Sequence, residues 1–303
     1  MFQKWSASST PLFSNCLFFQ TPPSCIIQTM NDAHEEVKVI CCDIDGTLVR
    51  DDKSLSEENM EWIRKAVAER NVAFTLVSGR MYNGVRPFYD MLGISGPISC
   101  YNGGTLYDDE GNIVEDHRIP HETALKLVEI QRRSKVGMIL FNDRKWYLEK
   151  LDNYIYPHKR KIYLSECETG SFDRFLGQFD SNKILFMSPS DSDLDRVQAM
   201  VKEAGLFEDA LTPYRAEHCL ELIPASVNKG LAIEALSRHF GVPCANIMAL
   251  GDDTNDIEML KTAGISVAMG NAVPAAKQAA RFETCTNNEN GVAKAIQRFV
   301  FGM

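Results

Sequence analysis

Two aspartates stand two residues apart where an apolar segment ends: Asp43 and Asp45 follow residues 37–42 directly. In that position one carboxylate can attack phosphorus and form an aspartyl-phosphate, while the other donates and accepts protons. A calcium-binding loop begins with the same spacing, but its twelfth position requires glutamate and here is Ser54. The pair therefore favours nucleophilic and acid-base chemistry over calcium binding.

A second group of polar residues follows the apolar segment 247–250. Asp252 stands near its end, and Asn255 and Asp256 come three and four residues later, so they share one face if a helix starts there. Oxygen ligands from Asp43, Asp252 and their neighbours would suit Mg²⁺, which prefers carboxylates, water and substrate phosphate. The alternative interpretation is that the second group only caps the N-terminus of a helix.

Three further residues are candidates for the same site. Ser78 follows the segment 72–77, and a hydroxyl and backbone N–H at that place can hold phosphate. Lys229 opens a predicted helix, where an ammonium and amide N–H groups would stabilise phosphoryl oxygens. Asn102 follows another apolar segment. Simpler interpretations exist, because Ser78 also stands in an ordinary turn and a lone lysine is usually a solvated surface group.

All these residues follow short apolar segments in a chain that alternates strands and helices. The alternation predicts strands at 37–42, 72–77, 97–101, 247–250 and 265–269, and helices at 57–70, before 92, from 229, and near 256–262, 274–280 and 292–299. Ser56 is the expected N-cap of the first helix. Parallel α/β sheets bind ligands at the carboxyl ends of their strands, so we expect one common site.

Residues 118–213 interrupt this alternation of strands and helices, and their pattern predicts an inserted α/β domain. Helices are predicted near 122–132 and 193–204, and strands at 138–141, 146–148 and 183–187. The expected organisation is therefore a leader at 1–36, a core made of 37–117 and 214–303, and an insertion at 118–213.

Net charge and cysteine content limit the classes of binding partner and the cellular compartment. Thirty-two Lys and Arg against 41 Asp and Glu give a net charge of −9 over 303 residues, which argues against nucleic acid and anionic membrane as partners. The nine cysteines are an odd number without a CxxC pair, so a reducing compartment is expected. We expect a cytoplasmic protein, or an organellar one if residues 1–30, which lack Asp and Glu, are a transit peptide.

Taken in order, five motifs resemble the haloacid dehalogenase superfamily, and specifically its Cof-like phosphatases: Asp43-Ile44-Asp45-Gly46-Thr47-Leu48, Ser78-Gly79-Arg80, Asn102-Gly103, Lys229-Gly230 and Gly251-Asp252-x-x-Asn255-Asp256. The resemblance covers about residues 37–303. It implies a Rossmann-like parallel sheet, a large α/β cap inserted in the core, and Mg²⁺-dependent hydrolysis of phosphate esters.

The resemblance also implies roles for single residues. Asp43 would be the nucleophile and a Mg²⁺ ligand, Asp45 the general acid/base that gives Mg²⁺ its backbone carbonyl, and Asp252 the remaining metal carboxylate. Phosphate would be bound by Thr47, Ser78, Gly79, Lys229 and Asn255, with Asp256 and Asn102 in support. Ser78 and Asn102-Gly103-Gly104 depart slightly from the family pattern, where Thr and Asn-Gly-Ala are commoner.

Substrate choice would then depend on the cap. Its loop and junction residues Asn142, Asp143, Lys145, Arg215 and Glu217 are candidates, although each is also readily explained as a solvated surface group. The expected partner is a small phosphorylated metabolite, most often a sugar phosphate by resemblance, bound by a monomer or homodimer. A hexose-phosphate mutase of the same superfamily and a non-catalytic regulator that binds a phosphometabolite are the alternatives.

Overall fold

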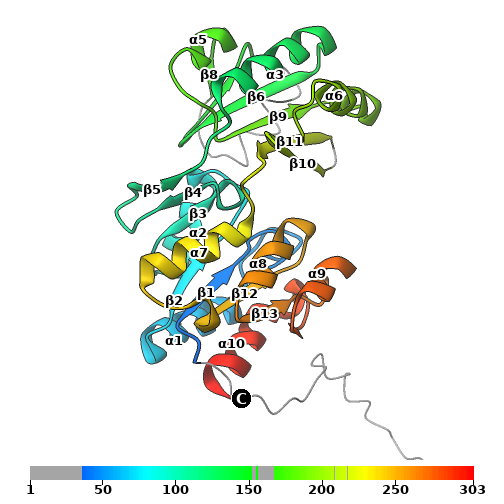
Figure 1. Cartoon of the computed structure of the whole chain (residues 1–303). Helices are drawn as coiled ribbons and strands as arrows, with labels where there is room; N and C mark the ends of the chain where they lie inside the picture. Colours follow the sequence, from blue (N-terminus) through cyan, green and yellow to red (C-terminus); the bar gives the residue numbers. More distant parts are fainter. Residues whose placement is uncertain (1–35, 152–154, 156–166, 208, 217) are drawn as a thin grey trace, which may run out of the picture.

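The structure is a computed structural model that describes residues 36–151, 155, 167–207, 209–216 and 218–303. These residues form a core around a parallel sheet and a cap with a sheet of its own, drawn one above the other in Figure 1. The predicted leader lies outside the described residues, apart from Glu36. Within the described ranges, no helix has the length and apolar character that a membrane crossing requires.

The core sheet has five parallel strands in the order β14-β13-β12-β1-β2. Its strands are β1 (Val39–Cys42), β2 (Ala73–Leu76), β12 (Ile247–Gly251), β13 (Ile265–Ala268) and β14 (Phe282–Glu283). Every residue of β1 is buried because the strand has neighbours on both edges and helices above and below, so its sequence is continuously apolar. The expected α/β fold with a Rossmann-like sheet is confirmed.

The core helices match the predicted alternation closely. They are α1 (Glu57–Arg70), α2 (Tyr82–Leu92), α7 (Lys229–Phe240), α8 (Ile257–Thr262), α9 (Pro274–Ala279) and α10 (Gly291–Phe301), with 3₁₀ turns η1 (Tyr101–Gly103), η2 (Cys244–Asn246), η3 (Thr254–Asp256) and η4 (Asn287–Glu289). Ser56 caps α1 as expected, since its hydroxyl oxygen accepts a hydrogen bond from the Asn59 N–H at 3.0 Å.

A small antiparallel sheet joins the core to the cap. It consists of β3 (Ile98–Cys100), β4 (Thr105–Tyr107) and β5 (Ile113–Asp116). The sequence predicted β3 as a further strand of the parallel alternation, but a single parallel bridge, Val77 to Ser99, links it to β2. The tight turn η1 sends the chain back along β3, so β4 becomes its main partner.

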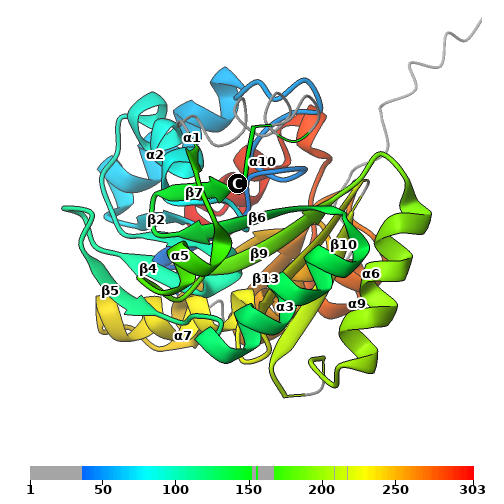
Figure 2. The ribbon, with the colours of Figure 1, turned by 90° about the horizontal axis from the view of Figure 1, so that it is seen from above.

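The cap sheet has six strands in the order β10-β11-β9-β6-β7-β8. Its elements are α3 (His121–Ser134), β6 (Gly137–Asn142), β7 (Lys145–Leu148), β8 (Glu168–Thr169), α5 (Phe172–Leu176), β9 (Lys183–Met187), α6 (Asp191–Glu203), β10 (Leu211–Ala216) and β11 (Cys219–Pro224). Figure 2 shows α3 and α6 lying across the outer face of this sheet.

The two faces of the cap sheet have different neighbours. Along β6, Met138 and Leu140 belong to the hydrophobic cluster that contains α3 and α6, whereas Ile139 and Phe141 belong to the cluster of the core. This alternation follows from the two-residue period of a strand. Every second residue of the central cap strands therefore faces the core.

The structure moves the boundary where the cap ends. The expected boundary at residue 213 falls inside β10, which pairs antiparallel with β11, and β11 pairs with β9 of the same sheet. Backbone hydrogen bonding thus ties both strands to the cap. We place the end of the cap near Pro224, so that the second part of the core begins just before α7.

Candidate active site

Loops from distant parts of the chain meet at the carboxyl ends of β1, β2 and β12. Thr47 Oγ1 donates a hydrogen bond to Asp252 Oδ1 at 2.7 Å, which joins the loops after β1 and β12. Asn255 Nδ2 donates to Asn102 Oδ1 at 3.0 Å, which joins the loop after β12 to η1. The residues predicted from separate motifs therefore share one site.

Lys229 lies fully buried between two carboxylates. Its Nζ is 2.6 Å from Asp43 Oδ1 and 2.5 Å from Asp256 Oδ1. Asn228 caps α7 through its side-chain oxygen, which fixes Lys229 as the first helical residue. Burial disfavours the ammonium, but the charges of Asp256 and Asp43 outweigh burial and raise the pKa of Lys229. One buried cation therefore holds Asp43 in place.

Asp256 is fully buried, and both of its oxygens have partners. Oδ1 contacts Lys229, while Oδ2 accepts hydrogen bonds from the backbone N–H groups of Asp252 at 2.8 Å and Asp253 at 3.0 Å. Asp253 and Asp256 form a capping box around η3. The capping interpretation and the supporting role expected of Asp256 thus describe the same contacts.

Thr47 orients Asp252. The threonine is fully buried, and its hydroxyl hydrogen is donated to the Asp252 carboxylate. A hydroxyl has one hydrogen, so this side chain does not donate to a phosphate. The Thr47 side chain thus positions a carboxylate, and the phosphate-binding role expected of Thr47 stays a prediction.

The acidic cluster fits a divalent cation. Asp43, Asp252 and Asp256 each offer a carboxylate oxygen, and these atoms all lie within 4.8 Å of one another. Both oxygens of Asp256 contact Lys229 or the backbone, whereas Asp43 contacts Lys229 through Oδ1 alone, which favours Asp43 and Asp252 as the ligands. Oxygen donors of this kind suit Mg²⁺. The contribution expected from the Asp45 backbone carbonyl stays a prediction.

Without a metal ion, Lys229 offsets only part of the electrostatic cost of the acidic cluster. Burial, reinforced by the charges of Asp256 and Asp252 and opposed by Lys229, raises the pKa of Asp43 from 3.8 to about 8. Burial also raises the pKa of Asp252, to about 6. Between pH 3.8 and about 8, Asp43 binds more protons in the folded protein than in the unfolded chain, so without metal its contribution to the free energy of unfolding falls as pH rises.

We therefore expect Mg²⁺ to raise the melting temperature more near pH 8 than near pH 6, because at the lower pH it must displace protons from the acidic cluster. Thermal unfolding with Mg²⁺ and with EDTA at the two pH values measures this difference. Asp43→Asn should remove most of it. Equal stabilisation by Mg²⁺ at both pH values would contradict this account of the cluster.

Asp45 is paired with two cations. Arg80 donates from Nε to Oδ2 and from Nη2 to Oδ1, both at 2.8 Å, and Lys53 Nζ lies 3.0 Å from Oδ1. Partial burial disfavours ionisation of Asp45, but the hydrogen bonds and charges of Arg80 and Lys53 outweigh it and lower the pKa. Asp45 is thus held as a carboxylate, which is the form that accepts a proton.

The turn after β2 presents a hydroxyl and backbone groups to the site. Ser78 is buried, and its Oγ accepts a hydrogen bond from the Arg80 N–H at 3.2 Å, which leaves the hydroxyl hydrogen to donate elsewhere. Gly79 lies against Asn102, since a Cβ at residue 79 would be 3.0 Å from Asn102 Oδ1. This arrangement supports the predicted role of Ser78 and Gly79 in binding phosphate.

Gly46 allows the first turn to approach Asp252. Its φ is +82°, and a Cβ there would lie 2.2 Å from Asp252 Oδ2. We expect Gly46→Ala to displace the Asp252 carboxylate, to cost about 1–3 kcal/mol of stability and to weaken Mg²⁺ binding about tenfold or more. Melting temperatures and Mg²⁺ titrations measure both effects.

The matched control is Gly241→Ala. Gly241 also has a positive φ, +66°, but a Cβ there meets nothing within 4 Å. This variant therefore carries the cost of the backbone conformation without the clash. Equal Mg²⁺ affinity in the two variants would show that the approach of Gly46 to Asp252 does not shape the metal site.

Asn142 and Asp143, predicted as substrate contacts, lie at the end of β6 and in the turn that follows it, and Asp143 joins the cap to the core. The Asp143 backbone oxygen accepts a hydrogen bond from Tyr101 OH at 2.5 Å, and its carboxylate accepts one from Tyr107 OH at 2.7 Å. Asn142 Oδ1 accepts a hydrogen bond from Arg118. These contacts give both residues a structural role at the junction, and a role in substrate binding stays a prediction.

Lys145 and Arg215 also have partners inside the cap. Lys145 Nζ lies 2.6 Å from Glu168 Oε1 on β8, and Arg215 Nη2 lies 3.1 Å from Asp191 Oδ1 at the start of α6. Arg215 thus contacts the helical layer of the cap, which argues against the predicted contact with substrate at the core. Glu217 lies outside the described residues.

Two residues at the site were not predicted: Lys183 of β9 and Glu221 of β11 form an ion pair that touches the loops after β2 and β3. Each is a charged residue inside an otherwise apolar strand, and that pattern is the signal that could have identified them. Arg80 is part of the Ser78-Gly79-Arg80 motif, but no role was predicted for it from the sequence. Its position directly after Ser78 and Gly79 places it at the carboxyl end of β2, with them.

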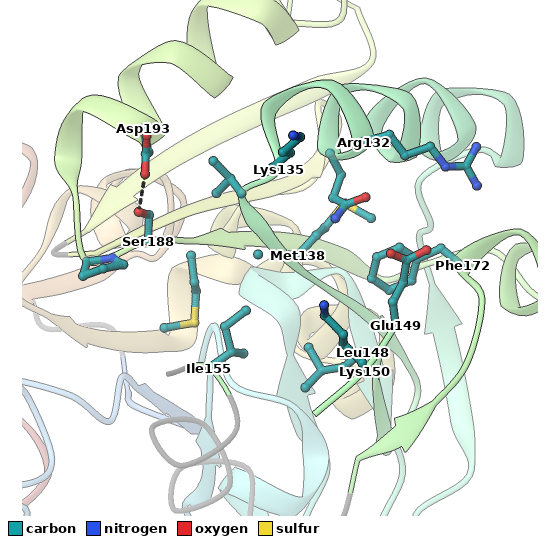
Figure 3. A pocket seen from close by; sticks show the side chains of 15 residues that line it. Arg132, Lys135, Met138, Leu148, Glu149, Lys150, Ile155, Phe172, Ser188 and Asp193 are labelled. Carbon is teal, nitrogen blue, oxygen red and sulfur yellow. Dashed lines mark hydrogen bonds between the residues drawn. The ribbon is translucent and has the colours of Figure 1, made fainter. Parts of the chain in front are cut away.

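A separate cavity of about 800 Å³ lies in the cap (Figure 3). Its lining combines the apolar side chains of Met138, Leu148 and Phe172 with Arg132 and Lys135, and all of its lining residues fall between 131 and 193. The acidic cluster contributes nothing to this lining. The cavity is therefore distinct from the candidate active site.

Comparison with known proteins decides the family. The family model of haloacid dehalogenase-like hydrolases matches residues 40–296, a range that contains every core residue of the candidate site. The chain belongs to this family. The haloacid dehalogenase-like fold, with its inserted cap, thus accounts for the core sheet and the cap sheet, and the expected membership of the Cof-like phosphatases is confirmed.

Curated relatives of this haloacid dehalogenase-like hydrolase are phosphatases. It is 32% identical over 238 residues to HMP-PP phosphatase of Serratia proteamaculans, covering 78% of this chain and 84% of that protein. It is 27% identical over 273 residues to 5-amino-6-(5-phospho-D-ribitylamino)uracil phosphatase YitU of Bacillus subtilis, covering 86% and 97%. The chain is a phosphatase of the haloacid dehalogenase type, a phosphoric monoester hydrolase.

A solved structure gives the same picture of the fold. A haloacid dehalogenase-like hydrolase from Bacteroides thetaiotaomicron superposes with a TM-score of 0.78 at 29% identity, covering 87% of this chain and 99% of that one. Since nearly the whole of that protein is matched, the likeness includes the cap as well as the core.

Proposed function

We propose that this haloacid dehalogenase-like phosphatase hydrolyses small phosphorylated metabolites, with sugar phosphates as the leading class, through an aspartyl-phosphate on Asp43 and with the help of Mg²⁺. The observation that carries the proposal is the buried contact of Lys229 with Asp43 and Asp256, next to Asp252. That arrangement holds one carboxylate in a fixed orientation at the meeting point of the strand ends, as a nucleophile requires.

The reaction would proceed in two displacements. Asp43 attacks phosphorus through the oxygen that Lys229 does not hold, and the bond from phosphorus to the leaving oxygen breaks. Asp45 gives a proton to that oxygen, which requires Asp45 to enter this step protonated and therefore released from Arg80 and Lys53, whose contacts lower its pKa. A water molecule then attacks the aspartyl-phosphate and gives its proton to Asp45, which releases phosphate and restores Asp43. The metal, when bound, would neutralise the negative charge that spreads over the phosphoryl oxygens.

The substrate class is supported by the relatives and by the cap. One relative acts, by its name, on a phosphorylated ribityl compound and another on HMP-PP, so phosphate groups on small organic molecules are the shared feature. In this chain the cap sheet packs with the core through one face, which places cap side chains above the strand ends. Such a cover can contact the leaving group and keep water out.

The test is phosphate release from a panel of sugar phosphates, nucleotides, phosphorylated flavin precursors and pyridoxal phosphate, with Mg²⁺ and with EDTA. We expect release from several sugar phosphates that EDTA abolishes. Transfer of phosphate between positions of a sugar without release would indicate a mutase instead. Tight binding of a phosphorylated compound without any turnover would indicate a regulator.

We expect Asp45→Asn to lower kcat by about 10²–10⁴-fold, because asparagine cannot transfer a proton to the leaving oxygen or from water. The loss should be smaller for substrates whose leaving group has a low pKa, since such groups need little protonation. Rates with p-nitrophenyl phosphate and with a sugar phosphate make the comparison. An equal loss on both substrates would move the acid role away from Asp45.

A further inference from the structure

A buried ion pair of the cap reaches the loops that bind phosphate in the proposed reaction, and that reaction does not use it. Lys183 Nζ and Glu221 Oε2 lie 2.8 Å apart, and the two side chains are 4% and 20% exposed. Removing both charges from water is costly, so a buried ion pair adds little net stability on its own. Its contacts with the core need another explanation.

Lys183 fixes a peptide group of the turn after β2. Its Nζ donates a hydrogen bond to the Gly79 backbone oxygen at 2.8 Å. The same peptide group carries the Arg80 N–H, which points away from that oxygen and donates to Ser78 Oγ at 3.2 Å. Because the peptide is planar, holding its oxygen also fixes its N–H. Lys183 therefore helps to leave the Ser78 hydroxyl hydrogen as the donor.

Glu221 fixes the direction of two amide side chains. An ionised carboxylate only accepts hydrogen bonds, so the Asn102 amide must turn its NH₂ group toward Glu221, where Nδ2 lies 3.0 Å from Oε1. Asn102 Oδ1 then faces Asn255, whose Nδ2 donates to it at 3.0 Å. The charge of one cap residue thus sets the orientation of Asn102 and Asn255 in the core.

We propose that Lys183 and Glu221 are positioning residues: through the Gly79–Arg80 peptide and the Asn102 amide, this cap ion pair orients the phosphate-binding groups Ser78 and Asn255 when the cap lies on the core. The inference rests on the proposed function, because it assigns those two groups to phosphate. It makes the affinity for the phosphoryl group, and not for the rest of the substrate, depend on a contact between the two domains.

Inorganic phosphate is the probe, since it has no leaving group and its binding requires no turnover. Calorimetry of the full chain with Mg²⁺ should show phosphate binding about ten- to a hundredfold weaker in Lys183→Met, which loses hydrogen bonds from a charged donor. Glu221→Gln keeps the size of the side chain but can also donate, so it should weaken binding about tenfold. Lys183→Arg should restore part of the affinity.

Lys183→Met leaves the partly buried Glu221 without its partner and can lower stability for that reason alone. The double variant Lys183→Met with Glu221→Gln removes both charges and should regain most of the melting temperature while phosphate binding stays weak. Arg196→Met is the control, since Arg196 pairs with Asp193 at 3.0 Å within α6, and it should bind phosphate like the wild type.

The outcomes separate three explanations. Phosphate affinity that recovers together with stability in the double variant would overturn the proposal in favour of a purely structural pair. Unchanged phosphate affinity with an altered ranking of substrates would also overturn it, because the pair would then contact the leaving group. If the wild type releases phosphate from no substrate but the variants still bind phosphate more weakly, the proposed function fails and the positioning role stands.

Discussion

Asp43→Asn is expected to lower phosphate release by about 10⁴-fold or more while leaving the fold intact. The asparagine amide is too weak a nucleophile to form the covalent intermediate, so the two-step path is lost. The protein should not be destabilised, because Lys229 keeps its contact with Asp256 at 2.5 Å and the site loses one of its crowded negative charges. Phosphate release and thermal unfolding measure the two halves of this prediction.

Asp109→Asn is a matched control, since Asp109 is exposed in the turn between β4 and β5 and should tolerate the same change. Mass spectrometry after brief mixing with substrate adds a direct test: the wild type should carry a phosphoryl group that the variant lacks. Turnover near the wild-type rate in a folded Asp43→Asn protein would refute the assignment of the nucleophile.

Lys229→Met is expected to be damaging in a different way. It leaves Asp43 and Asp256 buried without the ammonium that lies 2.6 Å and 2.5 Å from them, and breaking a buried pair of this kind costs about 3–5 kcal/mol. It also removes a donor near the transferring group, worth about 10²–10³-fold in rate. Denaturant unfolding and kcat measure the two losses separately.

Lys294→Met serves as the comparison, because Lys294 also contacts a carboxylate, Glu58 at 2.7 Å, but with both side chains partly exposed. Its loss should cost at most about 1 kcal/mol. Similar destabilisation by the two variants would mean that Lys229 does not carry the charge balance of the site. Raising Mg²⁺ should recover some stability in Lys229→Met, since the ion would take over part of that balance.

The core was predictable from sequence because its signals are local. Residues 37–42 are apolar without interruption, as a strand buried on both faces must be, and Ser56 marks the start of α1 through its own hydrogen bond. Strand ends then placed Asp43, Ser78 and Asp252 in one site, since parallel strands share a carboxyl edge. The motifs added the roles that spacing alone left open.

The cap was less predictable because its side chains depend on strand register. Arg215 was a candidate for a substrate contact. On β10 it follows Tyr214, which pairs across the sheet with Glu221, so Arg215 lies on the opposite face of the strand. Its guanidinium contacts Asp191 of α6. A shift of one residue in strand pairing moves every side chain to the other face of the sheet. The sequence of residues 211–224 does not by itself determine how β10 and β11 pair. Lys183 was equally hard to predict, since its two hydrogen-bond partners come from the turn after β2 and from β11.

The order of the strands in the core sheet has a consequence for how the protein is made. β1 pairs with β2 soon after both are synthesised, but its other neighbour, β12, follows only after the whole cap. Thr47 and Asp252, which are hydrogen bonded, are 205 positions apart. Contacts of such long range close late in folding. A growing chain on the ribosome thus completes the cluster of Asp43, Asp252 and Asp256 only after the whole cap, and a truncated product that ends within the cap would lack two of these carboxylates and have no activity.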